Sequence, residues 1–263
     1  HSYTKALLAC RPKPNKILKK LPTVNDFMDK KGFDLSEFYA LQEDSIEETK
    51  KRRQRYYKTS ALLELKNISK RYKTKKLFGK NHEIIALQNL SLSLFKGESL
   101  GIVGESGSGK STLGKCIIQL EMQDDGEIIF SKKKIDTLSR TELFDFRKSV
   151  QMIFQDPASA LNPKIRIGQM LIEIMQVHKI GKSSKERKKI AINLLEKVGL
   201  ETNHIDRFPH EFSGGQKQRI VIARALALQP KIIICDESVS ALDVSIQAQV
   251  LNLLNELKEQ FSL

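Results

Sequence analysis

One segment of the sequence has the residue types and spacing of a phosphate-binding loop. It reads Gly-Glu-Ser-Gly-Ser-Gly-Lys-Ser-Thr over residues 104–112 and matches the pattern G-x-x-x-x-G-K-[S/T]. Glycines let the backbone wrap closely around phosphate, and the helix expected at 112–120 presents its positive N-terminus to the same anion. A glycine-rich turn with a chance Lys-Ser pair is the alternative. The candidate phosphate-binding residues are Gly104, Glu105, Ser106, Gly107, Ser108, Gly109, Lys110, Ser111 and Thr112.

Two adjacent carboxylates follow an apolar run further along the chain. Residues 232–235 read Ile-Ile-Ile-Cys, and Asp236 and Glu237 come next. Ligands of open α/β sheets bind at the carboxyl ends of the strands, where this pattern would place both acids. Asp236 is expected to hold Mg²⁺, directly or through water, together with the Ser111 hydroxyl, and Glu237 to polarise an attacking water. Without a phosphate loop, the same pattern would be typical of a solvated turn.

A third motif lies between these two. Residues 212–219 read Phe-Ser-Gly-Gly-Gln-Lys-Gln-Arg and precede a helical stretch that runs through Leu228. A serine hydroxyl, flexible glycines and a helix N-terminus make a second anion site, and a plain helix N-cap is the alternative. The segment resembles the signature motif of ATP-binding cassette (ABC) ATPases. The residues that carry the resemblance are Ser213, Gly214, Gly215 and Gln216.

The resemblance to ABC ATPases implies roles for further residues. Gln155, in Met-Ile-Phe-Gln-Asp-Pro, matches the glutamine that contacts Mg²⁺ and the γ-phosphate and couples the site to a membrane partner. Ser240-Ala241-Leu242-Asp243 matches the loop at the seam between two cassettes, which places Asp243 there. Tyr72 is the candidate for stacking on adenine, although an exposed tyrosine beside basic residues is often unremarkable. The implied cofactors are ATP and Mg²⁺. The implied catalytic set is Glu237, Lys110 and Gln155, and the metal set is Ser111, Gln155 and Asp236.

Two stretches resemble one branch of the family, the ATPases of dipeptide and oligopeptide importers. They are residues 153–163 and 239–250, and the likeness covers about 61–263. The resemblance implies membrane permease subunits, an opposing cassette and, indirectly, an extracytoplasmic peptide-binding protein as partners. It also implies a peripheral location at the cytoplasmic face of the inner membrane, with no nucleic acid expected. Ser238 stands where the family usually has proline. The rival class is a soluble ABC ATPase of translation or DNA repair.

The hydrophobic pattern predicts the elements that would position these motifs. Strands are expected at 62–68, 90–94, 99–103, 126–130 and 232–235, with the run at 99–103 buried in a parallel sheet. Helices are expected at 185–198, ending at Gly199, and at 244–258. The fold class is therefore α/β. The resemblance adds a P-loop NTPase of the ABC type, with a mainly parallel core sheet, an antiparallel β subdomain and a helical subdomain.

The two ends of the chain suggest a larger tandem protein. Residues 1–8 resemble the His-Pro-Tyr-Thr tail that peptide-importer ATPases carry after their catalytic core, with Ser2 in place of proline. We therefore expect the tail of a preceding cassette at 1–20, a charged linker at 21–60 and a cassette at 61–263. A chance likeness in a polar extension is the alternative. His210 is the last histidine, so the family's histidine beyond the final helix is missing and the cassette is expected to be truncated.

Composition excludes several other classes. The 263 residues are 40% hydrophobic and 29% charged, which is the range of globular proteins. Cys10, Cys116 and Cys235 lie far apart, which argues against a disulfide framework or a structural zinc site. No apolar run approaches the roughly 18 residues that span a bilayer. The net charge of +14 suggests an anionic partner (nucleotide, nucleic acid or a membrane face), and a basic solvated surface is the alternative.

Overall fold

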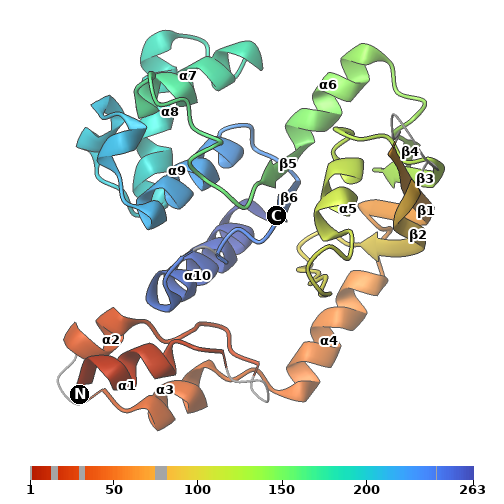
Figure 1. The fold of residues 1–263 in the computed structure, drawn as a ribbon. Helices are drawn as coiled ribbons and strands as arrows, with labels where there is room; N and C mark the ends of the chain where they lie inside the picture. The colour runs from red at the N-terminus through yellow and green to blue at the C-terminus, as the bar shows by residue number, and fades with distance from the viewer. Residues whose placement is uncertain (1, 13–16, 30–32, 75–81, 241) are drawn as a thin grey trace. The chain divides into compact units, whose positions relative to one another are not determined.

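The computed structural model describes residues 2–12, 17–29, 33–74, 82–240 and 242–263. The chain forms two compact units, whose elements are labelled in Figure 1. The first unit comprises residues 1–55, 153–229 and 237–262. The second comprises residues 56–152, 230–236 and Leu263.

An antiparallel sheet with the strand order β2-β1-β3-β4 forms the frame of the second unit. Its strands are β1 (Leu63–Thr74), β2 (His82–Leu94), β3 (Asp125–Phe130) and β4 (Lys133–Lys134). The alternating pattern of β1 shifts at a bulge near Asn67, whose φ is +53°, so Leu65 and then Ile68 point into the core. The strands predicted at 62–68, 90–94 and 126–130 are confirmed.

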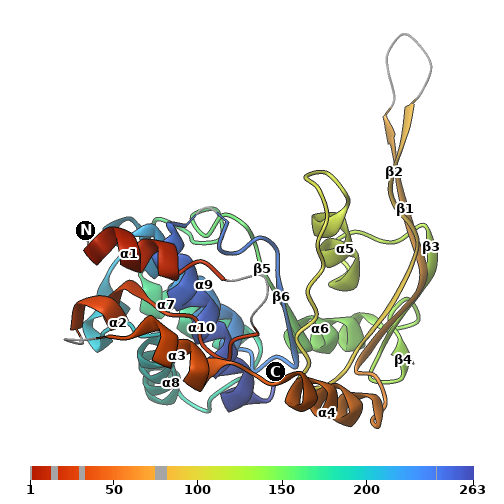
Figure 2. The same cartoon turned by 90° about the horizontal axis from the view of Figure 1, so that it is seen from below.

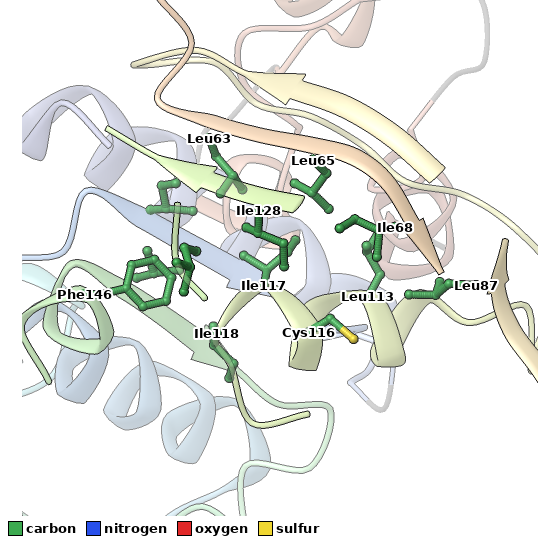
Figure 3. Packing of buried hydrophobic residues seen from close by; sticks show 13 residues of the cluster. Leu63, Leu65, Ile68, Leu87, Leu113, Cys116, Ile117, Ile118, Ile128 and Phe146 are labelled. Carbon is green, nitrogen blue, oxygen red and sulfur yellow. The ribbon is translucent and has the colours of Figure 1, made fainter. Parts of the chain in front are cut away.

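The helix that follows the glycine-rich loop, α5 (Lys110–Ile117), packs its apolar side on this sheet (Figure 3). Leu113 and Ile117 of α5 meet Leu65 of β1 and Ile128 of β3 in a buried cluster. The next helix, α6 (Arg140–Ser149), closes the cluster with a phenylalanine and begins with a capping box at Ser139. This core holds α5, and therefore the loop before it, in one place.

A second, two-stranded sheet pairs β5 (Val150–Ile153) with β6 (Ile232–Cys235), the predicted strand at 232–235. The buried strand predicted at 99–103 is wrong: these residues lie outside every strand of the described chain. Leu100 and Ile102 are each 45% exposed and Val103 is 94% exposed. An apolar run becomes a strand only through backbone hydrogen bonds to neighbours, and β5 and β6 are paired with each other instead. A mainly parallel core sheet stays a prediction.

Helices make up the first unit. Its core helices are α7 (Ile167–Val177), α8 (Ser184–Lys197), α9 (Gly214–Leu226) and α10 (Val244–Phe261). The helices predicted at 185–198 and 244–258 are confirmed. Gly199, with φ +73°, ends α8 as expected, and Val250 and Leu257 lie on the buried face of α10. Arg219 of α9 joins its neighbours by donating to the carbonyl of Val198 at 2.6 Å and to the side chain of Gln249 at 3.2 Å.

Four further helices precede the first strand in the described part of the chain. They are α1 (Ser2–Ala9), α2 (Val24–Asp29), α3 (Leu35–Gln42) and α4 (Ile46–Tyr57), so the predicted linker at 21–60 contains three helices. Within the first unit, α1 to α3 lie beside α10 (Figures 1 and 2). The buried amide of Asn252 on α10 accepts from the backbone N–H of Leu21 and donates to its carbonyl, both at 2.8 Å. Among the described residues, no helix combines the length and the apolar character that crossing a membrane requires.

Candidate functional site

The glycine-rich loop runs directly into the N-terminus of α5. Gly107 and Gly109 have φ values of +82° and +92°, a region that L-residues rarely adopt. A Cβ on Gly109 would also clash with the carbonyl oxygen of Ala86 on β2, so both the backbone conformation and the lack of space require glycine there. Gly109 is the N-cap of α5 and has no side chain with which to cap it. The first N–H groups of this helix are therefore suited to an anion, as the motif predicts.

Lys110 folds back over the loop that precedes it. Its Nζ donates to the carbonyl oxygens of Gly104 and Glu105, both at 2.8 Å. These bonds hold the ammonium group above the loop, which is largely exposed along its length. A phosphate that enters the loop would meet this cation once those two carbonyls release it.

Ser111 and Asp236 lie 125 positions apart in the chain and meet in the second unit. The Ser111 hydroxyl donates to Oδ1 of Asp236 at 2.8 Å. Packing explains the meeting, because Gly114 on α5 lies against Met152 of β5 and Ile234 of β6, and Asp236 directly follows β6. A hydroxyl and one carboxylate fit Mg²⁺, which binds few protein oxygens and keeps waters or phosphates as its other ligands. No larger cluster of His, Cys, Asp and Glu able to hold a metal occurs among the described residues.

Gln155 and Glu237 meet in the first unit. Nε2 of Gln155 donates to Oε2 of Glu237 at 3.1 Å. The backbone of Glu237 is left-handed, with φ +45°, and its carbonyl accepts from the N–H and the hydroxyl of Ser240 at 3.0 and 2.9 Å. A left-handed glutamate is a strained conformation, and such strain concentrates at functional sites. Two of the predicted site residues, Gln155 and Glu237, are therefore hydrogen-bonded to each other.

The signature segment caps α9 and packs against α10. Ser213 and Gln216 form a reciprocal capping box, in which each side chain accepts from the other residue's backbone N–H at 3.4 and 3.0 Å. A Cβ on Gly215 would come within 2.7 Å of Ile246, and one on Gly214 would contact Leu242. Close packing of helices explains the need for glycine at 215. The helix N-terminus expected to face an anion is thus present.

The loop expected at the cassette seam leads into α10. Asp243 is the N-cap of that helix, and its carbonyl accepts from the backbone N–H groups of Ile246 and Gln247 at 2.9 Å. Ala241, the second residue of this predicted loop, lies outside the described residues.

Tyr72 lies on β1 and its hydroxyl reaches α5. It donates to the carboxylate of Glu121 and lies 3.5 Å from Oγ1 of Thr112 in the first turn of the helix. Burial, and then the hydrogen bond to Glu121, raise the pKa of Tyr72, and that bond lowers the pKa of Glu121. Sequence reasoning missed Glu121, because nothing in the chain links two residues that are 49 positions apart.

The predicted residues thus gather in two groups, one in each unit. The second unit holds the phosphate loop with Lys110, the Ser111–Asp236 pair and Tyr72. The first unit holds the Gln155–Glu237 pair, the signature segment and Asp243. Asp236 and Glu237 are consecutive in the chain, and the first belongs to the second unit while the other belongs to the first unit.

Comparisons with known proteins all find ABC transporter ATP-binding proteins. Residues 87–240 match the family model described as ABC transporter. The chain is 48% identical over 203 residues to the oligopeptide transport ATP-binding protein OppF of Bacillus subtilis, a match covering 77% of this chain and 65% of that protein. It is 40% identical over 270 residues to the glutathione import ATP-binding protein GsiA of Salmonella typhimurium, covering 100% of this chain and 41% of that protein. The chain therefore spans less than two thirds of the length of these curated relatives.

Solved structures agree with the sequence comparisons. The ATP-binding cassette MJ0796, in a dimeric post-hydrolysis state bound to ADP and phosphate, matches with a TM-score of 0.66 and 34% identity. That match covers 75% of this chain and 83% of the other. The protein cbiO1 of Clostridium perfringens matches with a TM-score of 0.64 and 27% identity, covering 78% and 76%.

Proposed function

Because the chain belongs to the ABC transporter family, we propose that it binds MgATP and hydrolyses it to drive the import of dipeptides or oligopeptides through a membrane transporter. One observation carries the proposal. The serine that ends the phosphate loop and the aspartate that ends an apolar strand lie 2.8 Å apart although 125 positions separate them. A hydroxyl and a carboxylate brought together beside a phosphate loop are the oxygen set that a nucleotide-bound Mg²⁺ needs.

The phosphate loop binds the substrate in this proposal. Backbone N–H groups of residues 104–112 hold the β- and γ-phosphates, and Lys110 moves from the carbonyls of Gly104 and Glu105 to the phosphate oxygens. Ser111 and Asp236 hold Mg²⁺, with Gln155 as the third expected ligand. When bound, the ion neutralises charge that develops on the phosphates. Tyr72 stacks on the adenine.

Glu237 is the general base in this proposal. Its carboxylate takes a proton from water while the water oxygen bonds to the γ-phosphorus, and the bond to the leaving ADP oxygen breaks. Gln155 holds that carboxylate at 3.1 Å, so a move of Gln155 towards the nucleotide would free it. Gln155 would in this way have a role in timing hydrolysis.

The signature segment, Ser213, Gly214, Gly215 and Gln216, faces the nucleotide of an opposing cassette in this proposal, with Asp243 at the seam. The dimeric state of MJ0796 with ADP and phosphate supports that arrangement. Permease subunits, and indirectly a peptide-binding protein, are the further partners, at the cytoplasmic face of the membrane. The names of OppF and GsiA support import over the rival class of soluble ABC ATPases.

The division of the chain into a tail at 1–20, a linker at 21–60 and a cassette at 61–263 belongs to the same proposal. The match to GsiA covers all of this chain, so it includes the residues before 61. The core sheet of the cassette is expected to be mainly parallel.

Two substitutions test the proposal. Lys110→Ala should weaken binding of MgATP at least tenfold, about 1.4 kcal/mol, because the phosphates lose a main cation. Lys133→Ala, which removes an exposed lysine on β4 of the same unit, is the matched control and should bind as wild type. Equal affinities for ATP in titration calorimetry would refute the assignment of the loop.

Glu237→Gln separates binding from chemistry. It should keep the affinity for MgATP and lose nearly all turnover in the assembled transporter, because an amide cannot accept the proton. Persistent hydrolysis would place the base elsewhere.

A further inference from the structure

The hydroxyl of Tyr72 lies beside the first turn of α5, the helix into which the phosphate loop leads. Tyr72 comes from β1, pairs with Ile84 across the sheet, and donates to the carboxylate of Glu121 just beyond the C-terminus of α5. Its hydroxyl also lies 3.5 Å from Thr112, which follows Ser111 in the first turn. These contacts fix the position of the ring relative to the helix that follows the phosphate loop.

Glu121 is itself fixed by the end of that helix. Its backbone N–H donates to the carbonyl of Lys115 at 3.3 Å, and its other carboxylate oxygen lies 3.4 Å from Nζ of Lys115. The preceding turn is held by Arg147 of α6, which donates to the carbonyl of Gln119 at 2.7 Å. A carboxylate whose backbone and second oxygen are both engaged holds its acceptor oxygen in one place. A hydrogen bond from a phenol to such a carboxylate is charge-assisted and strongly directional.

We propose that Glu121 is a positioning residue for the nucleotide base: by holding the Tyr72 hydroxyl, it sets the ring of Tyr72 at a fixed place relative to the phosphate loop. This inference rests on the proposed function, in which Tyr72 stacks on adenine. A tethered ring loses less freedom when a base stacks on it, so the tether favours nucleotides over bare polyphosphate. Glu121 contributes nothing to the phosphates themselves.

Charge makes the inference testable. Removing a carboxylate from the neighbourhood of an anion site strengthens the binding of anions through simple electrostatics. A role for Glu121 through its charge alone therefore predicts tighter binding of both ATP and inorganic tripolyphosphate after Glu121→Ala. A role through Tyr72 predicts weaker binding of ATP and no loss for tripolyphosphate.

The experiment measures the affinity of the full chain for MgATP and for magnesium tripolyphosphate by titration calorimetry. The variants are Glu121→Ala, Glu121→Gln, Tyr72→Phe and the double variant Tyr72→Phe/Glu121→Ala. Glu127→Ala, which removes an exposed glutamate paired with Lys134 in the same unit, is the matched control. Glu121→Gln keeps an acceptor oxygen and should keep most of the affinity for ATP. It also serves as the test variant if Glu121→Ala does not fold.

Glu121→Ala and Tyr72→Phe should each weaken ATP binding about threefold to thirtyfold, because only part of the strength of one charge-assisted hydrogen bond is expressed in ring placement, and should leave tripolyphosphate binding unweakened. The double variant should be no weaker than either single one, because both remove the same bond. Unchanged ATP affinity in Glu121→Ala, or additive losses in the double variant, would overturn the inference and leave the proposed function standing. A wild-type chain that binds neither ligand would overturn both.

Discussion

Replacing Asn252 with alanine should release the N-terminal segment from α10. The side chain of Asn252 is 5% exposed and makes two hydrogen bonds of 2.8 Å with the backbone of Leu21, one as acceptor and one as donor. These bonds join residues 231 positions apart. The nearby ion pair between Lys20 and Glu256, at 3.7 Å, joins side chains that are both largely exposed and adds little.

The size of the effect follows from those two bonds. A typical intramolecular hydrogen bond contributes about 1 kcal/mol net, so the docked state should lose about 2 kcal/mol. That loss raises the population of the undocked segment about thirtyfold. Alanine is also a better helix former than asparagine by about 0.5 kcal/mol, so α10 itself should become slightly more stable. The segment should therefore open more often, and the free energy of global unfolding should fall by about 1.5 kcal/mol.

Limited proteolysis with trypsin and amide hydrogen exchange report that opening directly. Cleavage after Lys19 or Lys20 requires the segment to leave α10, so its rate tracks the open population. Asn255→Ala is the matched control, since it removes the same side chain from an exposed position of the same helix. Asn252→Ala should be cut about thirty times faster than Asn255→Ala under native conditions. Equal cleavage rates, or equal exchange at the Leu21 amide, would refute the idea that this amide docks the segment.

Three further changes test other parts of the structure. Gly126→Ala should lower the free energy of unfolding by about 2–4 kcal/mol, because Gly126 has φ +90° and a Cβ there would clash with the carbonyl oxygens of two β1 residues. A melting temperature equal to that of the wild type would contradict this. Gln218→Met should raise the free energy of unfolding by about 1 kcal/mol, since both amide atoms of this fully buried side chain lack a hydrogen-bond partner in the described chain. A lower melting temperature than that of the wild type would mean that ordered water satisfies these atoms. Although burial raises the pKa of Asp44, hydrogen bonds from Arg52 and Lys19 lower it overall, so Asp44→Asn should cost about 1 kcal/mol at pH 7. The difference in unfolding free energy between this variant and the wild type should disappear as the pH falls below about 4 through that lowered pKa. If urea unfolding at acid pH still showed the difference, the ion pair would be excluded as its source.

The pieces that local sequence could predict are those whose geometry is local. The phosphate loop, the N-cap serine of α9 and the glycine stop of α8 each depend on a few consecutive residues. The structure gives Gly109 a φ of +92° and Ser213 a capping box, as such motifs require. The periodicity of α10 likewise needs no distant partner to become visible in the sequence.

What the sequence could not predict depends on distant partners. The apolar run at 99–103 has the composition of a buried strand, but composition does not say whether a neighbour is present to pair with it. The charge pattern of residues 21–60 resembles a linker, and the side chain that docks this segment, Asn252, lies on the last helix. The role of Glu121 likewise could not be predicted, because its partner Tyr72 is distant in the sequence. Hydrogen bonds that span 49 or 231 positions leave no periodic trace.

The groups assigned to chemistry are already engaged with the chain's own polar atoms. Lys110 donates to two carbonyls, Ser111 donates to Asp236, and Glu237 accepts from Gln155. In the proposed function, binding of nucleotide would be an exchange of hydrogen bonds, and its net free energy would be smaller than the sum of the new contacts. The same engagement keeps each side chain in its place before the substrate arrives, which lowers the entropy lost on binding. In the proposed function, these internal hydrogen bonds would lower the net affinity for nucleotide and would also lower the entropy lost on binding.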